Sequence, residues 1–279
     1  MKNIQITNNN IQVSVVIPTY KPGTYLYECL DSLCNQTFPY YKYEVIIVLN
    51  GCKEPYENEL DEYIKRKNNV NFVYLQLHEG GVSNARNKAL DIARGEYITF
   101  IDDDDFVSPS YLEELYQNAR PNVVSLCYPL SFVDGTNRFE PYNITRSYRP
   151  TSDSNLIPFY KAHRYFGGPV YKLIHRNIIA DRRFDVRYKN GEDTLFMFLI
   201  SNKLSEVSFT SKNAVYYRRF RNNSATTCHR SLIYVINNSC NLSKEFIKIY
   251  CKGHNYKFIF LLKCLKGQFY TIIDHLLKL

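Results

Sequence analysis

Five short apolar runs that alternate with helical patterns constrain the fold of this chain more than any other feature. The runs are rich in valine and isoleucine, and they occupy residues 13–17, 43–49, 71–77, 96–101 and 122–128. Runs of this length and composition are typical of buried strands. Apolar residues at helical spacing separate them, over 25–34, 57–67, 83–94 and 109–119. The alternation predicts βαβ units and therefore an α/β fold, with a Rossmann-like, mostly parallel sheet flanked by helices.

The regular alternation ends at Pro129. Residues 129–158 are rich in proline, tyrosine, asparagine and serine, which predicts a long excursion with a hairpin at Asp134-Gly135. Ordered patterns return with a helix at 193–202 and a strand at 214–220, and residues 231–279 have a helical pattern. We therefore expect an N-terminal tail (1–11), an α/β domain (12–220) with two halves (12–128 and 129–220), and a helical extension (221–279).

The net charge of +8 lies in the C-terminal part of the chain. Residues 211–279 hold 12 lysines and arginines but only two acids, whereas the rest of the chain is nearly balanced. A basic segment favours a negatively charged partner, which could be a membrane surface, a nucleic acid or a phosphate-bearing substrate. The sequence carries no nucleic-acid-binding motif, so we expect no nucleic-acid partner. With neither a long apolar run nor a signal-peptide core, it predicts a cytoplasmic protein with reduced cysteines.

The last helical pattern, residues 256–279, is apolar on one side and basic on the other. It is too interrupted to span a bilayer, but such a helix can lie on an anionic membrane surface. It can equally dock on the body of the protein or on a second subunit. The pattern alone leaves these alternatives open. If the helix binds a membrane, the expected location of the protein is the inner face of the cell membrane.

Polar residues follow the predicted strands at the end where open α/β sheets bind ligands. They are Pro18-Thr19-Tyr20 after the first strand, Asn50-Gly51 after the second, Gly80-Gly81 after the third and Asp102-Asp103-Asp104-Asp105 after the fourth. An aromatic ring, amides, a helix N-terminus and carboxylates suit a nucleotide with a divalent metal ion.

The four adjacent aspartates are the sharpest of these signals. Neighbouring carboxylates raise one another's pKa unless a cation neutralises them. If the segment is extended, Asp102 and Asp104 point the same way and Asp103 points the opposite way. Two carboxylates on one side suit Mg²⁺ or Mn²⁺, with coordination positions left for phosphate oxygens.

Two helix N-termini add further candidates. The helix expected to open at Ser83, with Ser83 as its candidate N-cap, offers free N–H groups. Arg86 in its first turn can reach a phosphate or an aspartate of the acidic block. Glu192 and Asp193 precede the apolar run 195–200. Acids at such a position often cap a helix for purely structural reasons, so spacing alone does not make Asp193 a functional residue.

Taken together, these segments resemble the family 2 glycosyltransferases, which have the GT-A fold and invert the anomeric centre. The resemblance covers roughly residues 12–220. Its segments are 13–20, 44–51, Gly81 to Asn87, Gly95 to Asp105 with its DxD pair, and Gly191-Glu192-Asp193-Thr194. It makes residues 12–128 the nucleotide-sugar half and 129–220 the acceptor half of a catalytic domain.

The resemblance implies a role for each matching residue. The nucleotide sugar would contact Pro18, Thr19, Tyr20, Asn50, Arg86, Asp102 and Asp103. Asp104 would bind the metal, Mn²⁺ or Mg²⁺, that bridges the donor diphosphate. Asp193 would be the general base, with Gly168 and Glu192 on the acceptor side. One position departs from the family: Asn50 stands where an acid usually holds a uracil ring, so UDP is only the default nucleotide.

The resemblance implies a metal-dependent hexosyltransferase that uses a nucleoside-diphosphate sugar, in surface polysaccharide or glycolipid assembly. Its partners would be that donor and a saccharide or lipid-linked saccharide acceptor. Two alternatives remain. A sugar nucleotidyltransferase would need a glycine-rich loop with arginine and lysine after the first strand, which Pro18 to Gly23 matches poorly. A non-catalytic binding subunit of the same fold is suggested by Asn50.

Overall fold

The computed structural model describes residues 11–67, 69–136, 138–149, 156–220 and 230–277. Residues 1–10 of the expected N-terminal tail and residues 221–229 of the expected extension lie outside the described residues.

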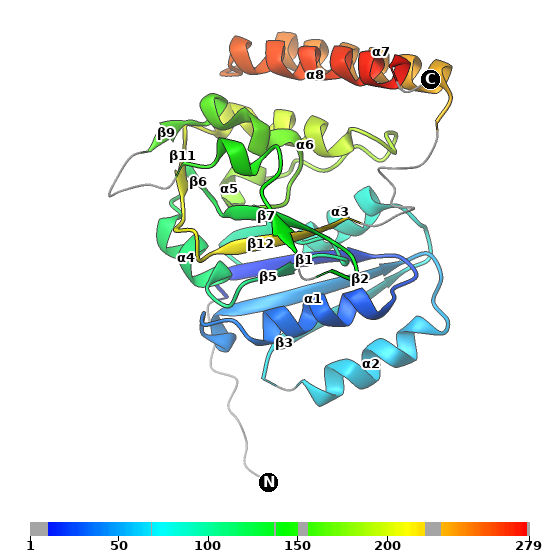
Figure 1. Ribbon diagram of the computed structural model, residues 1–279, viewed down its shortest axis with the longest axis vertical. Helices are drawn as coiled ribbons and strands as arrows, with labels where there is room; N and C mark the ends of the chain where they lie inside the picture. Colours follow the sequence, from blue (N-terminus) through cyan, green and yellow to red (C-terminus); the bar gives the residue numbers. More distant parts are fainter. Residues whose placement is uncertain (1–10, 68, 137, 150–155, 221–229, 278–279) are drawn as a thin grey trace.

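The central sheet has eight strands in the order β3-β2-β1-β4-β10-β6-β11-β9 (Figure 1). The pairs among β1 to β4 and the pair β6–β11 are parallel, whereas β9 and β10 are antiparallel to their neighbours. The mixed α/β class and the mostly parallel sheet are thus confirmed. The strands are β1 (Val13–Thr19), β2 (Tyr43–Asn50), β3 (Asn71–Leu77), β4 (Tyr97–Phe100), β6 (Val123–Leu126), β9 (Ile157–Pro158), β10 (Lys172–His175) and β11 (Glu206–Phe209).

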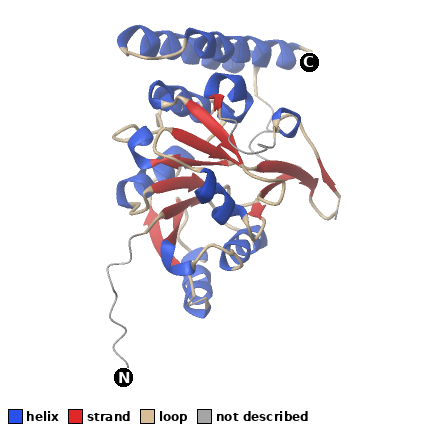
Figure 2. Ribbon diagram, turned by 90° about the vertical axis from the view of Figure 1, so that its left-hand side faces the viewer, coloured by secondary structure: helices blue, strands red, loops and turns tan. Residues whose placement is uncertain are grey.

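Helices flank this sheet, as Figure 2 shows from a second direction. Each of the four helices expected in the first half is present within a few residues of its predicted bounds, because its apolar stripe packs on a strand face. The α-helices of the body are α1 (Thr24–Cys34), α2 (Tyr56–Arg66), α3 (Val82–Ile92), α4 (Tyr111–Asn118), α5 (Arg176–Ile179) and α6 (Glu192–Ile200). The 3₁₀ segments are η1 (Tyr40–Lys42), η2 (Thr145–Ser147), η3 (Phe159–Gly167) and η4 (Ser201–Lys203).

A second sheet has four strands in the order β5-β12-β7-β8. Two of them, β7 and β8, lie in the first half of the predicted excursion at 129–158. Its strands are β5 (Phe106–Val107), β7 (Tyr128–Val133), β8 (Phe139–Glu140) and β12 (Val215–Phe220). The expected loss of regular structure at Pro129 is wrong, since β7 runs through Pro129 while pairing with β12. The hairpin at Asp134-Gly135 is confirmed, because β7 and β8 are antiparallel neighbours.

The helix α3 begins one residue earlier than expected, and Ser83 is not its N-cap. Gly81 occupies the cap position with a φ of 132°, a conformation that favours glycine. The backbone N–H of Gly81 donates to the Asn50 side-chain oxygen, which fixes the turn from the neighbouring strand end. The Ser83 hydroxyl lies inside the first helical turn, buried and without a hydrogen-bond partner.

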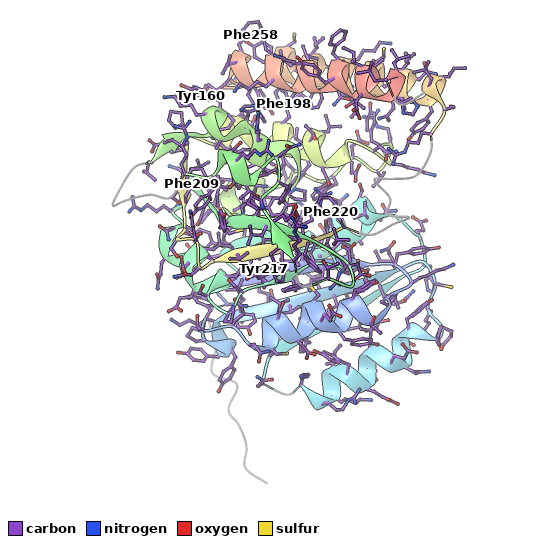
Figure 3. All side chains as sticks on the ribbon, viewed as in Figure 1. Tyr160, Phe198, Phe209, Tyr217, Phe220 and Phe258 are labelled. Carbon is purple, nitrogen blue, oxygen red and sulfur yellow. The ribbon has the colours of Figure 1, made fainter. Side chains whose placement is uncertain are left out.

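Two long helices, α7 (Leu232–Lys252) and α8 (Phe258–Leu276), form a layer over α6 and η3 (Figure 1). Phe260 of α8 is buried, with its ring centroid 5.3 Å from that of Phe159 and 5.7 Å from that of Phe198. Phe198 faces this layer from the body, whereas Phe258 lies at its outer side (Figure 3). The C-terminal helices therefore dock on the body. None of the helices in the described ranges is long and apolar enough to cross a membrane.

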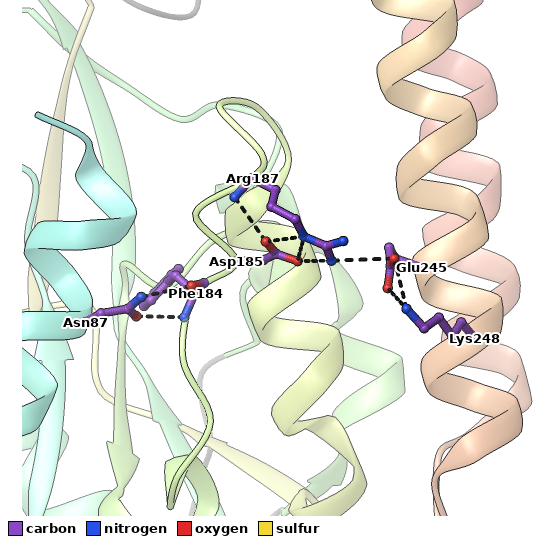
Figure 4. Close-up of polar contacts among 6 residues, drawn as sticks. All are labelled: Asn87, Phe184, Asp185, Arg187, Glu245 and Lys248. Carbon is purple, nitrogen blue, oxygen red and sulfur yellow. Dashed lines mark hydrogen bonds and ion pairs between the residues drawn. The ribbon is translucent and has the colours of Figure 1, made fainter.

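A polar contact chain also joins α3 to α7 (Figure 4). The Asn87 amide accepts from the backbone N–H of Phe184 and donates to its carbonyl. Three residues later, Arg187 pairs with Asp185 at 2.6 Å and with Glu245 of α7 at 3.5 Å. The middle of the loop between α5 and α6 is thereby held by α3 on one side and by α7 on the other.

Phe260→Ala should lower the free energy of unfolding by about 3–5 kcal/mol, because it leaves a cavity between α8 and the body. Phe258→Ala is the matched control, since Phe258 is 57% exposed and removing its ring opens no cavity. Urea unfolding of the two variants checks this. Equal losses in both would contradict the docking of α8 through Phe260.

Candidate active site

A buried arginine joins two carboxylates that are far apart in the sequence. One terminal nitrogen of Arg86 lies 2.6 Å from Asp193 Oδ1, and the other lies 3.1 Å from Asp102 Oδ1. The guanidinium lies over the Phe184 ring, 5.3 Å from its centroid, and its Nε is buried without a partner. Burial lowers the pKa of Arg86, but the two carboxylates outweigh burial and raise it. Arg86 is therefore charged, and it fixes the distance between the acidic block and α6.

Asp193 lies in the first turn of α6, where Gly191 provides the turn with a φ of 84°. Burial raises the pKa of Asp193, while the Arg86 charge acts in the opposite direction. About a third of its side-chain surface remains exposed. Asp193 and the acidic block thus share one site, which places a carboxylate that can act as a base beside the acidic turn.

The acidic block is a turn, so the expected alternation of side chains is wrong. The backbone N–H of Asp105 donates to the Asp102 carbonyl at 3.1 Å, which closes the turn. The Thr19 hydroxyl donates to the Asp103 carboxylate at 2.5 Å, while Asp102 pairs with Arg86. Thr19 and Asp103 therefore link the ends of β1 and β4.

Asp105 is a buried anchor for this turn, a role that the sequence did not indicate. It accepts from the Tyr216 hydroxyl at 2.7 Å and from the backbone N–H of Arg219 at 2.8 Å. Burial, followed by the charges of Asp104 and Asp102, raises the pKa of Asp105 well above its ordinary value. Asp105 therefore has a structural role, whereas Asp102 keeps part of its carboxylate exposed to the site.

Arg219 of β12 supports the same turn from behind and was also missed. Its Nε donates to the Asp104 carbonyl at 2.9 Å, and its terminal nitrogens pair with Asp134 and Glu28. The guanidinium lies over the Tyr25 ring at 4.3 Å. The pairing of β12 with β5 and β7, together with α1, brings these residues together, so local sequence signals could not have found them.

The three consecutive residues that were expected to contact the nucleotide after the first strand differ in exposure. Pro18 and Thr19 are buried at the end of β1, whereas Tyr20 is 56% exposed and lies against Gly51. Asn50 is buried, and its amide donates to the Thr19 carbonyl at 2.7 Å while its oxygen accepts from Gly81 at 2.9 Å. Asn50 therefore ties together the ends of β1, β2 and β3.

The acceptor-side candidates lie directly beside Asp193. A side chain at Gly168 would place its Cβ 3.6 Å from Asp193 Oδ2, and the Thr194 hydroxyl donates to the Gly167 carbonyl at 2.8 Å. Glu192 is buried, and burial followed by the Asp193 charge raises its pKa to about 7. The loop before β10 and the first turn of α6 therefore form one surface.

Within the described ranges, no three His, Cys, Asp or Glu side chains lie together to form a metal site on their own. The donor chemistry still fits a hard cation that takes most of its ligands from a substrate. Asp102 keeps 43% of its side chain exposed, and Asp104 lies two residues away in the same turn. Carboxylate oxygens with open coordination positions suit Mg²⁺ or Mn²⁺ bound together with phosphates.

Comparison with known proteins gives a consistent result. The sequence profile described as "Glycosyl transferase family 2" matches residues 14–183. The poly(ribitol-phosphate) beta-glucosyltransferase of Bacillus spizizenii is 29% identical over 231 residues, which are 81% of this chain and 34% of that protein. The poly(ribitol-phosphate) beta-N-acetylglucosaminyltransferase TarS of Staphylococcus aureus is 28% identical over 232 residues, 81% of this chain and 38% of TarS.

Solved structures show the same fold. S. aureus TarS in complex with UDP-GlcNAc superposes with a TM-score of 0.68 at 21% identity, covering 95% of this chain and 72% of that one. The mannosyltransferase of Pyrobaculum calidifontis in complex with GDP-Man and Mn²⁺ has a TM-score of 0.60 at 18% identity, covering 96% and 74%. These proteins have the GT-A fold, which confirms the expected fold. The chain spans about a third of the length of the first two curated relatives that it matches.

Glu192→Gln should change stability in a pH-dependent way. A carboxyl whose folded pKa is raised from 4.5 to about 7 stabilises the protein less as pH rises through that range. The free energy of unfolding of the variant, relative to the wild type, should therefore rise by up to roughly 3 kcal/mol between pH 4.5 and 8. Urea unfolding across this range measures it, with the exposed Glu62→Gln as control. A constant difference would contradict the raised pKa.

Proposed function

The chain belongs to glycosyl transferase family 2, and on that basis we propose that it transfers a hexosyl unit from a nucleoside-diphosphate sugar to an acceptor hydroxyl with inversion. One observation carries this proposal: Arg86 holds Asp193 of α6 and Asp102 of the acidic turn in a single site. An acid placed to bind the donor and a second carboxylate placed to act as a base, within one site, suit a single displacement at an anomeric carbon.

We propose a UDP-sugar as the donor. TarS, which has this fold, is known in complexes with UDP and UDP-GlcNAc. Tyr20 would lie against the base, with Pro18, Thr19, Asn50 and Asp103 forming the end of the nucleotide site. The Asn50 amide is already bonded to the backbone on both of its polar atoms, which favours a supporting role over base selection.

We propose that Asp104, with Asp102 beside it, binds Mn²⁺ or Mg²⁺ together with the donor diphosphate. The cation would neutralise the negative charge that develops on the diphosphate leaving group. Arg86 contributes fixed positive charge near the same group, and it keeps Asp102 aligned through its own ion pair.

Asp193 takes the proton of the acceptor hydroxyl as that oxygen attacks the anomeric carbon. Its Oδ1 is bound by Arg86, while Oδ2 lies toward Gly168. The ion pair lowers the basicity of the carboxylate, but the acceptor proton becomes acidic as the new bond forms, so the fixed position of Oδ2 matters more than its resting pKa. Attack from the face opposite the leaving group gives a β-linked product from an α-linked donor.

We propose a cell-surface polymer as the acceptor, since the relatives include two poly(ribitol-phosphate) glycosyltransferases and a minor teichoic acid biosynthesis protein. Gly168 and Glu192 would border the acceptor hydroxyl. The division into a nucleotide-sugar half (12–128) and an acceptor half (129–220) follows the same assignment.

Asp193→Asn and Asp104→Ala should each lower turnover by about 100-fold or more while leaving the fold intact, because each removes a group that acts on a reacting atom. The assay is a panel of UDP- and GDP-sugars with poly(ribitol phosphate), with and without Mn²⁺, read by release of nucleoside diphosphate and by product linkage. Asp91→Asn, at a surface ion pair with Arg183, is the control.

Near-normal turnover in either variant would remove that assignment, and an α-linked product from an α-linked donor would exclude single displacement by Asp193. Nucleotide binding without transfer or hydrolysis would instead support the non-catalytic binding subunit, and release of pyrophosphate from a nucleoside triphosphate would support the nucleotidyltransferase.

We further propose that the outer face of α8 contacts an anionic membrane surface. Four large side chains at helical spacing, Phe258, Leu262, Phe269 and Tyr270, are exposed on it, and Lys266 lies among them. Apolar residues with interspersed lysines bind the boundary between lipid headgroups and acyl chains. The opposite face, with Phe260 and Cys264, is buried against the body.

Because α7 and α8 pack on the body, point substitutions test this contact better than removal of the helices. The double variant Leu262→Ser, Phe269→Ser should weaken binding to phosphatidylglycerol vesicles by about tenfold or more while UDP binding is unchanged. Flotation with phosphatidylglycerol and phosphatidylcholine vesicles measures it. Unchanged binding, or equal binding to both lipids, would contradict the proposal.

A further inference from the structure

A lysine that is fully buried lies behind the acceptor side of the site. Lys172 begins β10, and its ammonium donates to the carbonyls of Gly168 at 2.5 Å and Val170 at 2.6 Å. The same ammonium lies 5.6 Å from the centroid of the Phe166 ring. A buried charge is costly unless it is paired or hydrogen-bonded, so this lysine needs a structural or functional reason.

The segment that Lys172 grips has an unusual backbone. Tyr171, between the second gripped carbonyl and Lys172 itself, has a φ of 70°, which is rare for a bulky residue and strained. Its ring is buried against Tyr216 at 4.6 Å, and its carbonyl accepts from the backbone N–H of Cys127. The turn is therefore held in its strained form from several sides.

The other side of this turn faces Asp193. The Gly167 carbonyl accepts from the Thr194 hydroxyl, and Gly168 lies against Asp193 Oδ2 with no side chain between them. The loop before β10 is thus bound on its buried side by the Lys172 ammonium and on its other side by Thr194 of α6. The position of Gly168 relative to Asp193 depends on both.

We propose that Lys172 is a positioning residue for the acceptor: its ammonium clamps the Gly168 and Val170 carbonyls and so sets the wall beside Asp193 against which the acceptor hydroxyl is aligned. The acceptor role of this wall rests on the proposed function. The clamp itself rests on the contacts of Lys172 alone. Lys172 does not touch the reacting atoms.

The clamp is sensitive to protonation. Burial lowers the pKa of Lys172 to about 7, and Cys127 and Asp193, the titratable groups that face it from the neighbouring strand end and from α6, act in the opposite direction. Since the ammonium is the better donor, the clamp should weaken as pH rises above about 7.

Lys172→Met tests the clamp, because it keeps the length of the buried stem and removes the charge and the donors. Lys203→Met is the matched control, since Lys203 donates to the Asn177 carbonyl from the exposed surface. Hydrogen exchange of the amides of 167–171 should become about tenfold faster or more in Lys172→Met and stay unchanged in Lys203→Met. Unchanged exchange in Lys172→Met would overturn the clamp.

The acceptor role has its own measurement. With UDP-GlcNAc as donor, Lys172→Met should raise the KM for poly(ribitol phosphate) about tenfold or more while the Kd for UDP stays within about twofold. The wild-type transfer rate should decline above about pH 7, and Lys172→Met should lack this decline. A loosened loop with an unchanged acceptor KM and pH profile would overturn the positioning role.

Two further results separate the possible failures. A wild type that transfers nothing in the donor panel would refute the proposed function, while hydrogen exchange would still decide the clamp. If Lys172→Met does not fold, the wild type at pH 6 and pH 8.5, corrected for intrinsic exchange rates, replaces it. Lower protection of 167–171 at pH 8.5 supports the clamp, and equal protection overturns it.

Discussion

The ion pairs of Arg86 determine how the rest of the site is organised. A guanidinium that is almost fully buried would be strongly unfavourable without partners, and its partners are carboxylates that come from positions 16 and 107 residues further along the chain. The pairing therefore couples the folding of residues 12–128 to the docking of α6. Each carboxylate partners the same guanidinium, so the three side chains form one unit.

The acidic turn and the turn before Asp193 are held in place by different parts of the fold. The acidic turn is supported by local strand ends and, from behind, by Asp105 and Arg219. The turn before Asp193 is supported by α7: the Asn190 amide donates to the Tyr234 hydroxyl, and its carbonyl accepts from Asn238. The C-terminal helices thus take part in placing the candidate base, in addition to any contact that their outer faces make.

The sequence predicted what depends on short-range patterns. The first strands and helices, the acidic block after the fourth strand, Arg86 near an aspartate and Asp193 at a helix N-terminus all follow from periodicity and neighbouring residues. Ser83 as a cap failed because Gly81, held by Asn50 from another strand, began the helix earlier. The extended geometry of the acidic block failed because a turn closes it.

What escaped prediction depends on pairing between distant segments. The β7–β12 ladder runs through a proline that normally ends a strand, and the pairing of β12 with β5 brings Arg219 under the acidic turn. The sequence around Lys172 does not indicate that its ammonium is buried. In each case the partner lies in another element, and a local pattern holds no information about it.

The packing of Leu242 against Gly191 has a consequence for how such a domain can be divided. A Cβ at Gly191 would collide with Leu242, so the backbone of the turn before Asp193 and the side of α7 are fitted to each other. The stretch that the family profile recognises ends ten residues short of Asp193. The smallest portable module therefore extends past both the profile and the last strand. A cut at the end of the profile would separate Asp193 from Arg86, and a cut after β12 would separate Asp193 from the side of α7 that fits its turn.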